Sequence, residues 1–242
     1  MSDALLQVKG VSKHFGGFAA LSEVSIEVRQ GERFGLIGPN GSGKTTLINC
    51  VSGSLHNETG SITFAGEEIS GLPAYQRTRR GIARSFQIPR PFSSMSVLEN
   101  LVVPLEFVVH RRSLHQTNTS DEAMAILKTI GLADKADTPS NRLSQVELRK
   151  MELARAMAAR PRLLISDEAM AGLSSNEVAE VLGILFKLNE TGITIIMIEH
   201  IMQAVMRFSQ RVVCLDAGKI ICEGTPETIV KNGDVQKAYL GA

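Results

Sequence analysis

The run Gly38-Pro39-Asn40-Gly41-Ser42-Gly43-Lys44-Thr45 fits the pattern G-x-x-x-x-G-K-[ST] of a phosphate-binding loop. An apolar stretch, 33–37, predicts a strand before it, and a helix is expected after it, from Lys44 to about Gly53. Glycines let successive backbone N–H groups turn toward one anion, and the helix start adds its positive end. The run therefore predicts a triphosphate site, in which Lys44 reaches the β- and γ-phosphates and Thr45 ligates Mg²⁺.

The alternative is a glycine-rich turn with an exposed lysine, but that alternative does not explain the strand and helix that flank the run. The sequence has no Asn-Lys-x-Asp stretch of the kind that reads guanine, so the expected nucleotide is ATP.

The composition narrows the class of protein. The chain of 242 residues carries 26 basic and 25 acidic side chains, a formal charge of +1, so no nucleic-acid partner is expected. Cys214 and Cys222 lie in apolar stretches and are expected to be buried thiols. Residues 1–10 show no signal peptide, and the most apolar stretches, 101–109 and 193–198, are far shorter than the roughly 20 residues of a membrane span. If the protein works at a membrane, a partner must cross it.

Polar side chains follow two further apolar strands. The first stretch, residues 163–168, reads Leu-Leu-Ile-Ser-Asp-Glu and ends in two acids. The second, residues 193–200, reads Ile-Thr-Ile-Ile-Met-Ile-Glu-His and ends in an acid and a histidine. The alternation of strands and helices over 163–215 predicts a parallel sheet, whose ligands bind beyond the carboxyl ends of its strands. We expect Asp167 to hold Mg²⁺, Glu168 to act as the base that orients water, and His200 to hydrogen-bond the γ-phosphate. The alternatives are helix capping by the acids and a structural role for the histidine.

Periodicity places the remaining elements. Strands are expected at 5–11, 24–28, 60–64 and 211–215, and helices at 73–80, 121–130, 145–159, 176–190 and 201–208. Residues 82–101 are rich in Pro and Ser, which predicts irregular structure there. The pattern indicates an α/β core interrupted by a mostly helical insert.

In this order, the motifs resemble those of the ATP-binding-cassette ATPases, and the resemblance covers nearly the whole chain. It implies an α/β fold with a P-loop NTPase (RecA-like) core and a parallel sheet, an N-terminal antiparallel β subdomain and an inserted helical subdomain. Residues 1–242 would form one ATPase domain, with the nucleotide-binding core at 1–83 and 156–242 and the helical signature subdomain at 84–155.

The resemblance also assigns roles to single residues. Phe15 matches the aromatic that stacks on adenine, and Gln87 matches the glutamine that lines the Mg²⁺ and water site. Asp167 and Glu168 match the Walker B pair, and His200 matches the switch histidine. The residues expected to be catalytic are Glu168, His200 and Gln87, and those expected to hold Mg²⁺ are Thr45, Gln87 and Asp167. The residues expected to bind ATP are Phe15, Gly38, Pro39, Asn40, Gly41, Ser42, Gly43, Lys44, Thr45, Thr46 and Ser144.

Two stretches, Arg79-Arg80-Gly81-Ile82-Ala83-Arg84-Ser85-Phe86-Gln87 and Ile198-Glu199-His200-Ile201-Met202, look most similar to the ATPases of branched-chain amino acid importers and their amide or urea relatives. That family implies two cassette subunits, identical or related, under a pair of integral-membrane permeases, with a separate solute-binding protein. The chain would then lie peripherally on the cytoplasmic side of the inner membrane. Segment 88–100 matches the permease-docking region, where Phe92, Met95 and Val97 either face the permease or pack within the insert.

The chain departs from the family at its signature. Leu-Ser-x-Gly-Gln appears here as Leu143-Ser144-Gln145-Val146-Glu147, and Ala171-Gly172-Leu173-Ser174 lacks a terminal Asp that many relatives have. Glycine permits close approach to a ligand, whereas valine adds a branched side chain and Glu147 adds a negative charge. Ser144-x-x-Glu147 also fits a capping box, which would preserve the helix start.

Two explanations of the altered signature stay open, a slow ATP site on the partner subunit and variation within the subfamily. The other functions considered are lipid or lipopolysaccharide export, a cassette protein acting on DNA or ribosomes, and a weakly hydrolysing regulator. The transported solute does not follow from the sequence.

Overall fold

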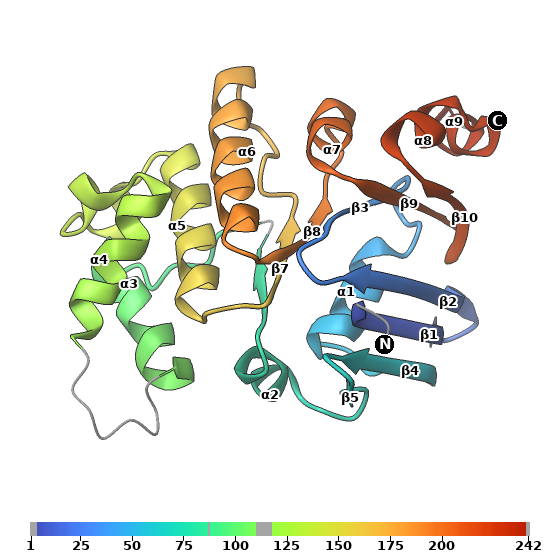
Figure 1. Ribbon diagram of the computed structural model, residues 1–242, viewed down its shortest axis with the longest axis horizontal. Coiled ribbons are helices and arrows are strands. Elements are labelled where there is room, and N and C mark those ends of the chain that lie inside the picture. Colours follow the sequence, from blue (N-terminus) through green and yellow to red (C-terminus); the bar gives the residue numbers. More distant parts are fainter. Residues whose placement is uncertain (1–3, 87, 110–117, 241–242) are drawn as a thin grey trace.

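The strands form two sheets in the computed structural model, which describes residues 4–86, 88–109 and 118–240 (Figure 1). The first sheet is antiparallel, in the order β2-β1-β4-β5, and contains β1 (Ala4–Phe15), β2 (Phe18–Arg29), β4 (Thr59–Phe64) and β5 (Glu67–Glu68). The second sheet has the order β10-β9-β3-β8-β7-β6. Its strands are β3 (Arg33–Ile37), β6 (Ile82–Ser85), β7 (Leu163–Asp167), β8 (Thr194–Ile198), β9 (Arg211–Asp216) and β10 (Lys219–Gly224). All its pairs are parallel except β9 with β10.

Helices occupy most of the remaining described chain. They are α1 (Lys44–Ser52), α2 (Ala74–Arg79), α3 (Val97–Pro104), α4 (Thr119–Ile130), α5 (Gln145–Ala158), α6 (Ser175–Glu190), α7 (Met202–Phe208), α8 (Pro226–Lys231) and α9 (Gly233–Leu240). Helices α3, α4 and α5 lie together at one side of the molecule, away from the antiparallel sheet (Figure 1). In the ranges that the structure describes, no helix combines the length and the apolar character needed to cross a bilayer.

The parallel sheet is covered on both faces. Every residue of β7 and β8 is buried, as the unbroken apolar runs predict for strands of this kind. One hydrophobic core joins the antiparallel sheet and α1 to one face, and a second joins the helices of the insert and α6 to the other. Because both faces are filled, polar residues can leave the sheet only at strand ends. The α/β fold class, with its parallel sheet and antiparallel N-terminal part, is confirmed.

The expectation of irregular structure over 82–101 was right for residues 86 and 88–96, which lie outside helices and strands, but wrong at both ends of the range. Residues 82–85 form the edge strand β6, which pairs in parallel with β7. Helix α3 begins after Ser96, whose hydroxyl accepts the Glu99 N–H while the Glu99 carboxylate accepts the Ser96 N–H. This Ser-x-x-Glu capping box outweighs the nearby prolines and serines, which lie before the helix.

Two further predictions concern the burial of the cysteines and the limits of the helical insert. Cys214 is buried as expected, but Cys222 is only partly buried, because β10 is an edge strand of its sheet. The expected limits of the helical insert, residues 84 and 155, fall inside β6 and α5. The division of the chain into core and insert therefore stays a prediction.

Arg77 ties the C-terminal end of α1 to the segment before α2. It is fully buried, and its guanidinium donates to the carbonyls of Cys50 (2.5 Å), Val51 (2.9 Å), Leu72 (2.8 Å) and Ser70 (2.9 Å). Two of these carbonyls belong to the last turn of α1, which carries Lys44 at its other end.

We expect Arg77→Met to lower the free energy of unfolding by about 3 kcal/mol, because buried carbonyls lose their donors. Urea denaturation measures this change. Arg79→Met on the exposed face of α2 is the control and should shift stability by no more than about 0.5 kcal/mol. Equal urea midpoints for the two variants would contradict the role of Arg77 as hydrogen-bond donor to the carbonyls at the end of α1.

Candidate nucleotide site

The predicted phosphate loop leaves β3 and turns into α1 under tight steric constraint. Gly38 has φ +151°, and a Cβ there would lie 2.1 Å from the Leu215 carbonyl oxygen. Gly43 has φ +105°, and a Cβ there would lie 2.6 Å from the Ala20 carbonyl oxygen. Both positions therefore require glycine, which fixes the path of the loop between β9 and β2.

Lys44 lies folded back onto the loop that carries it. Its Nζ donates to the carbonyls of Gly38 at 2.7 Å and Pro39 at 3.0 Å. Burial lowers the pKa of Lys44, and the nearby carboxylates of Glu168 and Asp167 act in the opposite direction. The loop lysine and the two acids after β7 are thus electrostatic neighbours, as the shared sheet edge predicts.

A cavity of about 230 Å³ runs along this loop. It is lined by Phe15, Phe18, Ala20, Asn40, Gly41, Ser42, Gly43, Lys44, Thr45 and Thr46. Phe15 and Phe18 expose 51% and 61% of their surface, so both rings are accessible to a planar base, and Lys13 Nζ lies over the Phe15 ring at 5.6 Å from its centroid. The structure therefore brings the expected adenine residue and the expected phosphate loop into one cavity. Phe18 was not predicted to belong to this site. It begins β2 and pairs with Phe15 across the β1–β2 turn, and its position three residues after Phe15 was the available signal.

Glu168 and His200 meet at the ends of adjacent strands β7 and β8. The distance between His200 Nε2 and Glu168 Oε1 is 2.8 Å. Glu168 has φ +47°, a left-handed conformation that costs a non-glycine residue about 1–2 kcal/mol. Its backbone N–H donates to the Ile198 carbonyl at 2.9 Å, which holds it there. Such strain is characteristic of functional sites, because only a surrounding structure that fixes the residue can maintain it.

Asp167 pairs with an arginine that sequence reasoning gave no role. Arg84 Nη2 lies 2.5 Å from Asp167 Oδ2, and Arg84 Nη1 lies 2.6 Å from Asn49 Oδ1 on α1. The Asp167 carboxylate and the Thr45 hydroxyl are oxygen ligands of the kind that Mg²⁺ takes beside nucleotide phosphates. The donor set therefore fits Mg²⁺. Gln87, the third expected ligand and an expected catalytic residue, lies outside the described residues.

Glu199, the neighbour of His200, is a third residue of the site that was not predicted from the sequence, after Phe18 and Arg84. It is 2% exposed, and its Oε1 accepts the backbone N–H of Met170 at 2.9 Å. Burial raises the pKa of Glu199 to about 7, and the charge of Glu168 adds to the rise. A carboxyl at a strand end beside a candidate switch histidine was the available signal.

The altered signature begins α5 with the predicted capping box. Ser144 Oγ accepts the Glu147 N–H, and the Glu147 carboxylate accepts the Ser144 N–H at 2.8 Å. That hydrogen bond is the main reason why the pKa of Glu147 is lowered, so its carboxylate stays charged. Val146 packs against the core of the helical insert. Gln145 and Arg149 both donate to the Ala171 carbonyl at 3.4 Å, which connects the signature to the segment after Glu168.

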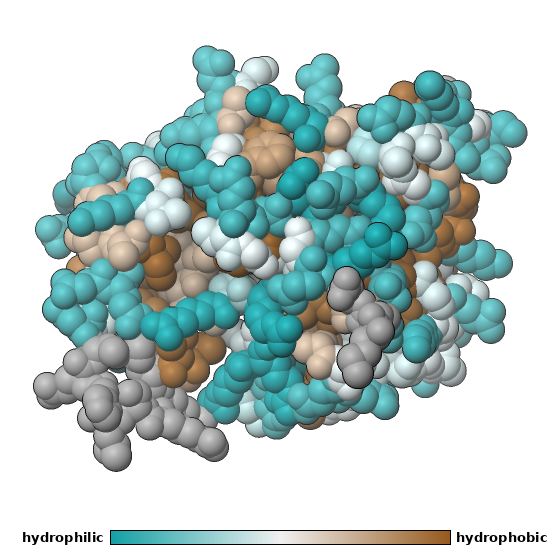
Figure 2. Space-filling model, viewed as in Figure 1, coloured by the Kyte–Doolittle hydropathy of each residue, from teal (hydrophilic) through white to brown (hydrophobic). Residues whose placement is uncertain are grey.

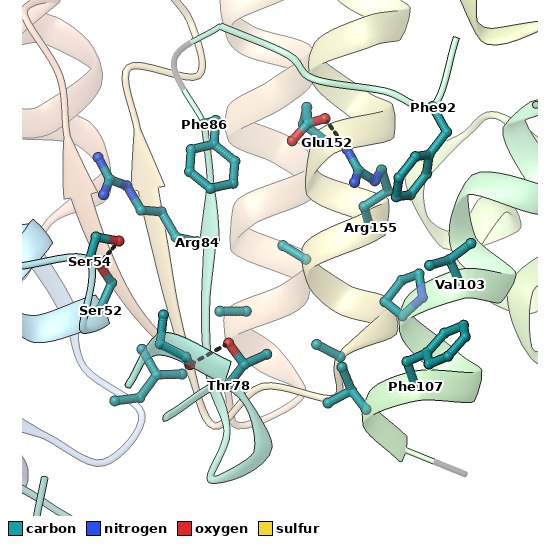
Figure 3. Close-up of a pocket in the computed structure, with 17 residues that line it drawn as sticks. Ser52, Ser54, Thr78, Arg84, Phe86, Phe92, Val103, Phe107, Glu152 and Arg155 are labelled. Atoms are coloured by element: carbon teal, nitrogen blue, oxygen red, sulfur yellow. Dashed lines mark hydrogen bonds and ion pairs between the residues drawn. The ribbon is translucent and has the colours of Figure 1, made fainter. Parts of the chain in front are cut away.

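A second cavity, of about 340 Å³, lies between the core and the insert (Figure 3). Phe86 lies on the β6 side of this cavity, and Phe92, Val103 and Phe107 lie opposite it on the insert (Figure 3). The guanidinium of Arg84 extends away from these three residues, toward Asn49 of α1. Phe86, Phe92 and Phe107 expose 46%, 41% and 65% of their surface, so aromatic side chains surround the opening of this cavity. On the face drawn in Figure 2, hydrophobic residues surface among polar ones over the helical side of the molecule.

The three residues singled out in segment 88–100 differ in burial, and only Val97 packs fully within the insert. Val97 is completely buried and belongs to the core of the insert. Phe92 is exposed at the second cavity, and Arg155 lies over its ring at 5.1 Å. Met95 is half-buried.

Comparison with known proteins identifies the family. Residues 21–171 match the family described as ABC transporter, and residues 219–242 match the family described as branched-chain amino acid ATP-binding cassette transporter. The chain belongs to the ABC transporter ATP-binding cassette family. It is 39% identical to the high-affinity branched-chain amino acid transport ATP-binding protein LivG of Salmonella typhimurium, over all of this chain and 99% of that protein. It is 36% identical to the corresponding protein BraF of Pseudomonas aeruginosa, over the same shares.

Solved structures agree with this assignment. The ADP conformation of an ATP-binding cassette of an ABC transporter superposes with a TM-score of 0.89 at 30% identity, covering both chains completely. A dimeric cassette in a post-hydrolysis state with ADP and phosphate gives a TM-score of 0.82 at 26% identity, over 91% of this chain and 98% of the other. The predicted resemblance is confirmed, and this cassette is an ATPase of the ABC transporter type.

Glu199 makes the stability of the cassette depend on pH. A carboxyl whose pKa is higher in the folded chain than its ordinary value of 4.5 stabilises the fold fully below that value, and this contribution is lost as the pH rises through about 7. Because one pKa unit corresponds to about 1.4 kcal/mol, the loss approaches about 3 kcal/mol.

In Glu199→Gln this loss is absent, since the amide keeps a hydrogen-bond acceptor and never ionises. We therefore expect the Tm of the variant, relative to the parent, to be higher at pH 8 than at pH 5. Thermal melts at both pH values test this, with Glu190→Gln at the exposed end of α6 as the control for charge. The same relative Tm at both pH values would refute the assignment.

Proposed function

We propose that this cassette hydrolyses ATP to drive solute import through a membrane ABC transporter, with branched-chain amino acids or related small polar solutes as cargo. The contact between Glu168 and His200, beside the loop that holds Lys44, is the observation that carries the catalytic part. The relatives named for high-affinity branched-chain amino acid transport support the cargo class.

Each residue of the nucleotide site has a separate role in the proposed binding and hydrolysis of ATP. The loop amides and Lys44 bind the β- and γ-phosphates, while Phe15 stacks on adenine. Glu168 orients the attacking water and takes up its proton, and His200 donates a hydrogen bond to the γ-phosphate. In the free cassette, the acid and the histidine satisfy each other at 2.8 Å. ATP and water would replace that contact, so the two side chains are already placed when the nucleotide arrives.

Mg²⁺, held by Thr45, Asp167 and Gln87, would shield the phosphate charge. Arg84 keeps one Asp167 oxygen paired at 2.5 Å, which holds this carboxylate in a fixed position while the site is free. The pair also places the Asp167 side chain next to α1 through the contact of Arg84 with Asn49.

The proposed partners of the cassette are inferred from its exposed apolar surface and from its relatives. The apolar opening between core and insert is the proposed seat of an integral-membrane permease, because exposed clusters of aromatic rings mark interaction sites. A second cassette would complete the ATP site with its signature, in line with the dimeric relative. A solute-binding protein outside the inner membrane would deliver the cargo, with this chain on the cytoplasmic side.

The catalytic proposal is tested by Glu168→Gln. The amide cannot accept the proton of the attacking water, so we expect Mg·ATP to bind but turnover to fall at least 100-fold. Phosphate release measures turnover, and retention of labelled ATP measures binding. Lys44→Ala is the control that should lose binding itself, because the loop ammonium is gone. Normal turnover in Glu168→Gln would remove this residue from the role of base.

We further propose that this chain's signature serves a slower ATP site on its partner. Glu147 is held as a charged carboxylate at the start of α5, where the family contacts a γ-phosphate. The same feature favours a second candidate function, a nucleotide-binding regulator with weak turnover. Hydrolysis measured with and without the permease and partner cassette separates the two functions.

Val146→Gly tests the signature. Glycine removes the branched side chain and permits close backbone approach, so we expect hydrolysis by the assembled pair to rise severalfold. Leu148→Gly, two residues further along the same helix, controls for a general loosening of α5 and should not raise the rate. Unchanged hydrolysis in Val146→Gly would favour simple variation within the subfamily.

A further inference from the structure

The last helix of the chain touches the first residue of the phosphate loop. The backbone N–H of Gly38 donates to the hydroxyl of Tyr239, at 2.8 Å, across 201 residues of sequence. Tyr239 lies in α9, which stands with α8 beside β9 and β10 at the C-terminal end of the molecule (Figure 1). The segment that carries it, 219–242, matches the branched-chain amino acid ATP-binding cassette transporter family.

The Gly38 N–H depends on this hydroxyl. The parallel pairing of β3 ends at Leu36 with Ile198 on one side and at Ile37 with Cys214 on the other. The next amide, that of Gly38, is therefore past the ladder, and Gly38 itself is buried. A buried N–H without an acceptor is costly, so removal of the hydroxyl would force the loop to move.

Gly38 also holds the loop lysine. Its carbonyl accepts from Lys44 Nζ at 2.7 Å, while its N–H donates to Tyr239. A φ of +151° and the close Leu215 carbonyl leave Gly38 few other conformations. The tyrosine hydroxyl thus holds Gly38 in place. Gly38 is the first residue of the loop, and its carbonyl is also an acceptor for Lys44.

The helix that presents Tyr239 is itself well anchored. Asn232 Oδ1 accepts the N–H groups of Asp234 at 2.9 Å and Val235 at 3.1 Å, which caps α9. Val235 is buried in the larger hydrophobic core, as is Ile229 of α8. Tyr239 exposes 37% of its surface, but its hydroxyl points inward to Gly38, and this partial burial raises its pKa to about 12. The hydroxyl therefore stays neutral and adds no negative charge near a triphosphate.

We infer that Tyr239 is a positioning residue of the nucleotide site, through which the C-terminal helix holds the phosphate loop in its binding conformation. This inference rests on the proposed function, because it concerns the affinity of the same loop for nucleotide. Without the hydroxyl, the free loop relaxes, and binding must reorder it.

Tyr239→Phe removes one oxygen atom and tests the inference directly. We expect the Kd for Mg·ADP, measured by calorimetry, to rise about three- to tenfold. Tyr75→Phe is the matched control, since the Tyr75 hydroxyl on α2 pairs with Gln76 and not with the loop, and its Kd should equal that of the parent. An unchanged Kd in Tyr239→Phe overturns the inference, also if its Tm falls, because that result would mean a structural role alone.

A spectroscopic readout separates positioning from stability. The chain has 2 tyrosines and no tryptophan, so Tyr75→Phe leaves Tyr239 as its single tyrosine. We expect its tyrosine emission to change when Mg·ADP binds, with Tyr239→Phe as the correction for nucleotide absorbance. No change in emission would count against the inference. If the parent chain itself fails to bind Mg·ADP, the proposed function fails, whereas binding by the parent with equal affinity in Tyr239→Phe defeats this inference alone.

Discussion

A sheet covered on both faces can present polar groups only where its strands end, and the nucleotide site depends on this constraint. Strands β3, β8 and β7 are neighbours and run in parallel, so their carboxyl ends share one edge. Gly38, His200 and Glu168 each lie just past one of these ends. Their meeting therefore follows from topology, and side-chain contacts such as the 2.8 Å one between His200 and Glu168 refine it.

The ammonium of Lys44 has hydrogen-bond acceptors before a ligand arrives. Burial of an ion costs several kcal/mol unless partners compensate, and the loop supplies Lys44 with carbonyls at 2.7 Å and 3.0 Å. These acceptors are neutral. A phosphate oxygen that replaces them carries a negative charge, so it adds a Coulomb attraction to the ammonium that the neutral carbonyls do not supply. The site thus keeps the lysine placed at low cost, and it gains affinity when a stronger acceptor takes over.

Local patterns predicted much of the fold and the site, whereas contacts between distant segments did not follow from them. The phosphate loop, β7 and β8 were predicted because each has an unbroken local signature. Helix α3 was missed because the prolines before it were weighed above its own Ser96 and Glu99 cap. The partners of Asp167 and Gly38 lie 83 and 201 residues away, and no periodicity reports such pairs. Gln87 stays a prediction outside the described chain.

The altered signature at the start of α5 is well suited to begin the helix and less well suited to contact a phosphate. A hydroxyl has two acceptor sites and one donor, so Ser144 can cap α5 and still donate to a phosphate. Glu147 opposes this, because two unit charges about 5 Å apart at an effective dielectric constant of about 20 repel by roughly 3 kcal/mol. A hydrogen bond to a charged group contributes only about 1.5–3 kcal/mol. Lys135, 3.5 Å from Glu147, offsets part of the repulsion. If the segment faces a phosphate of a second cassette, as proposed, the helix is preserved while the affinity for phosphate is reduced.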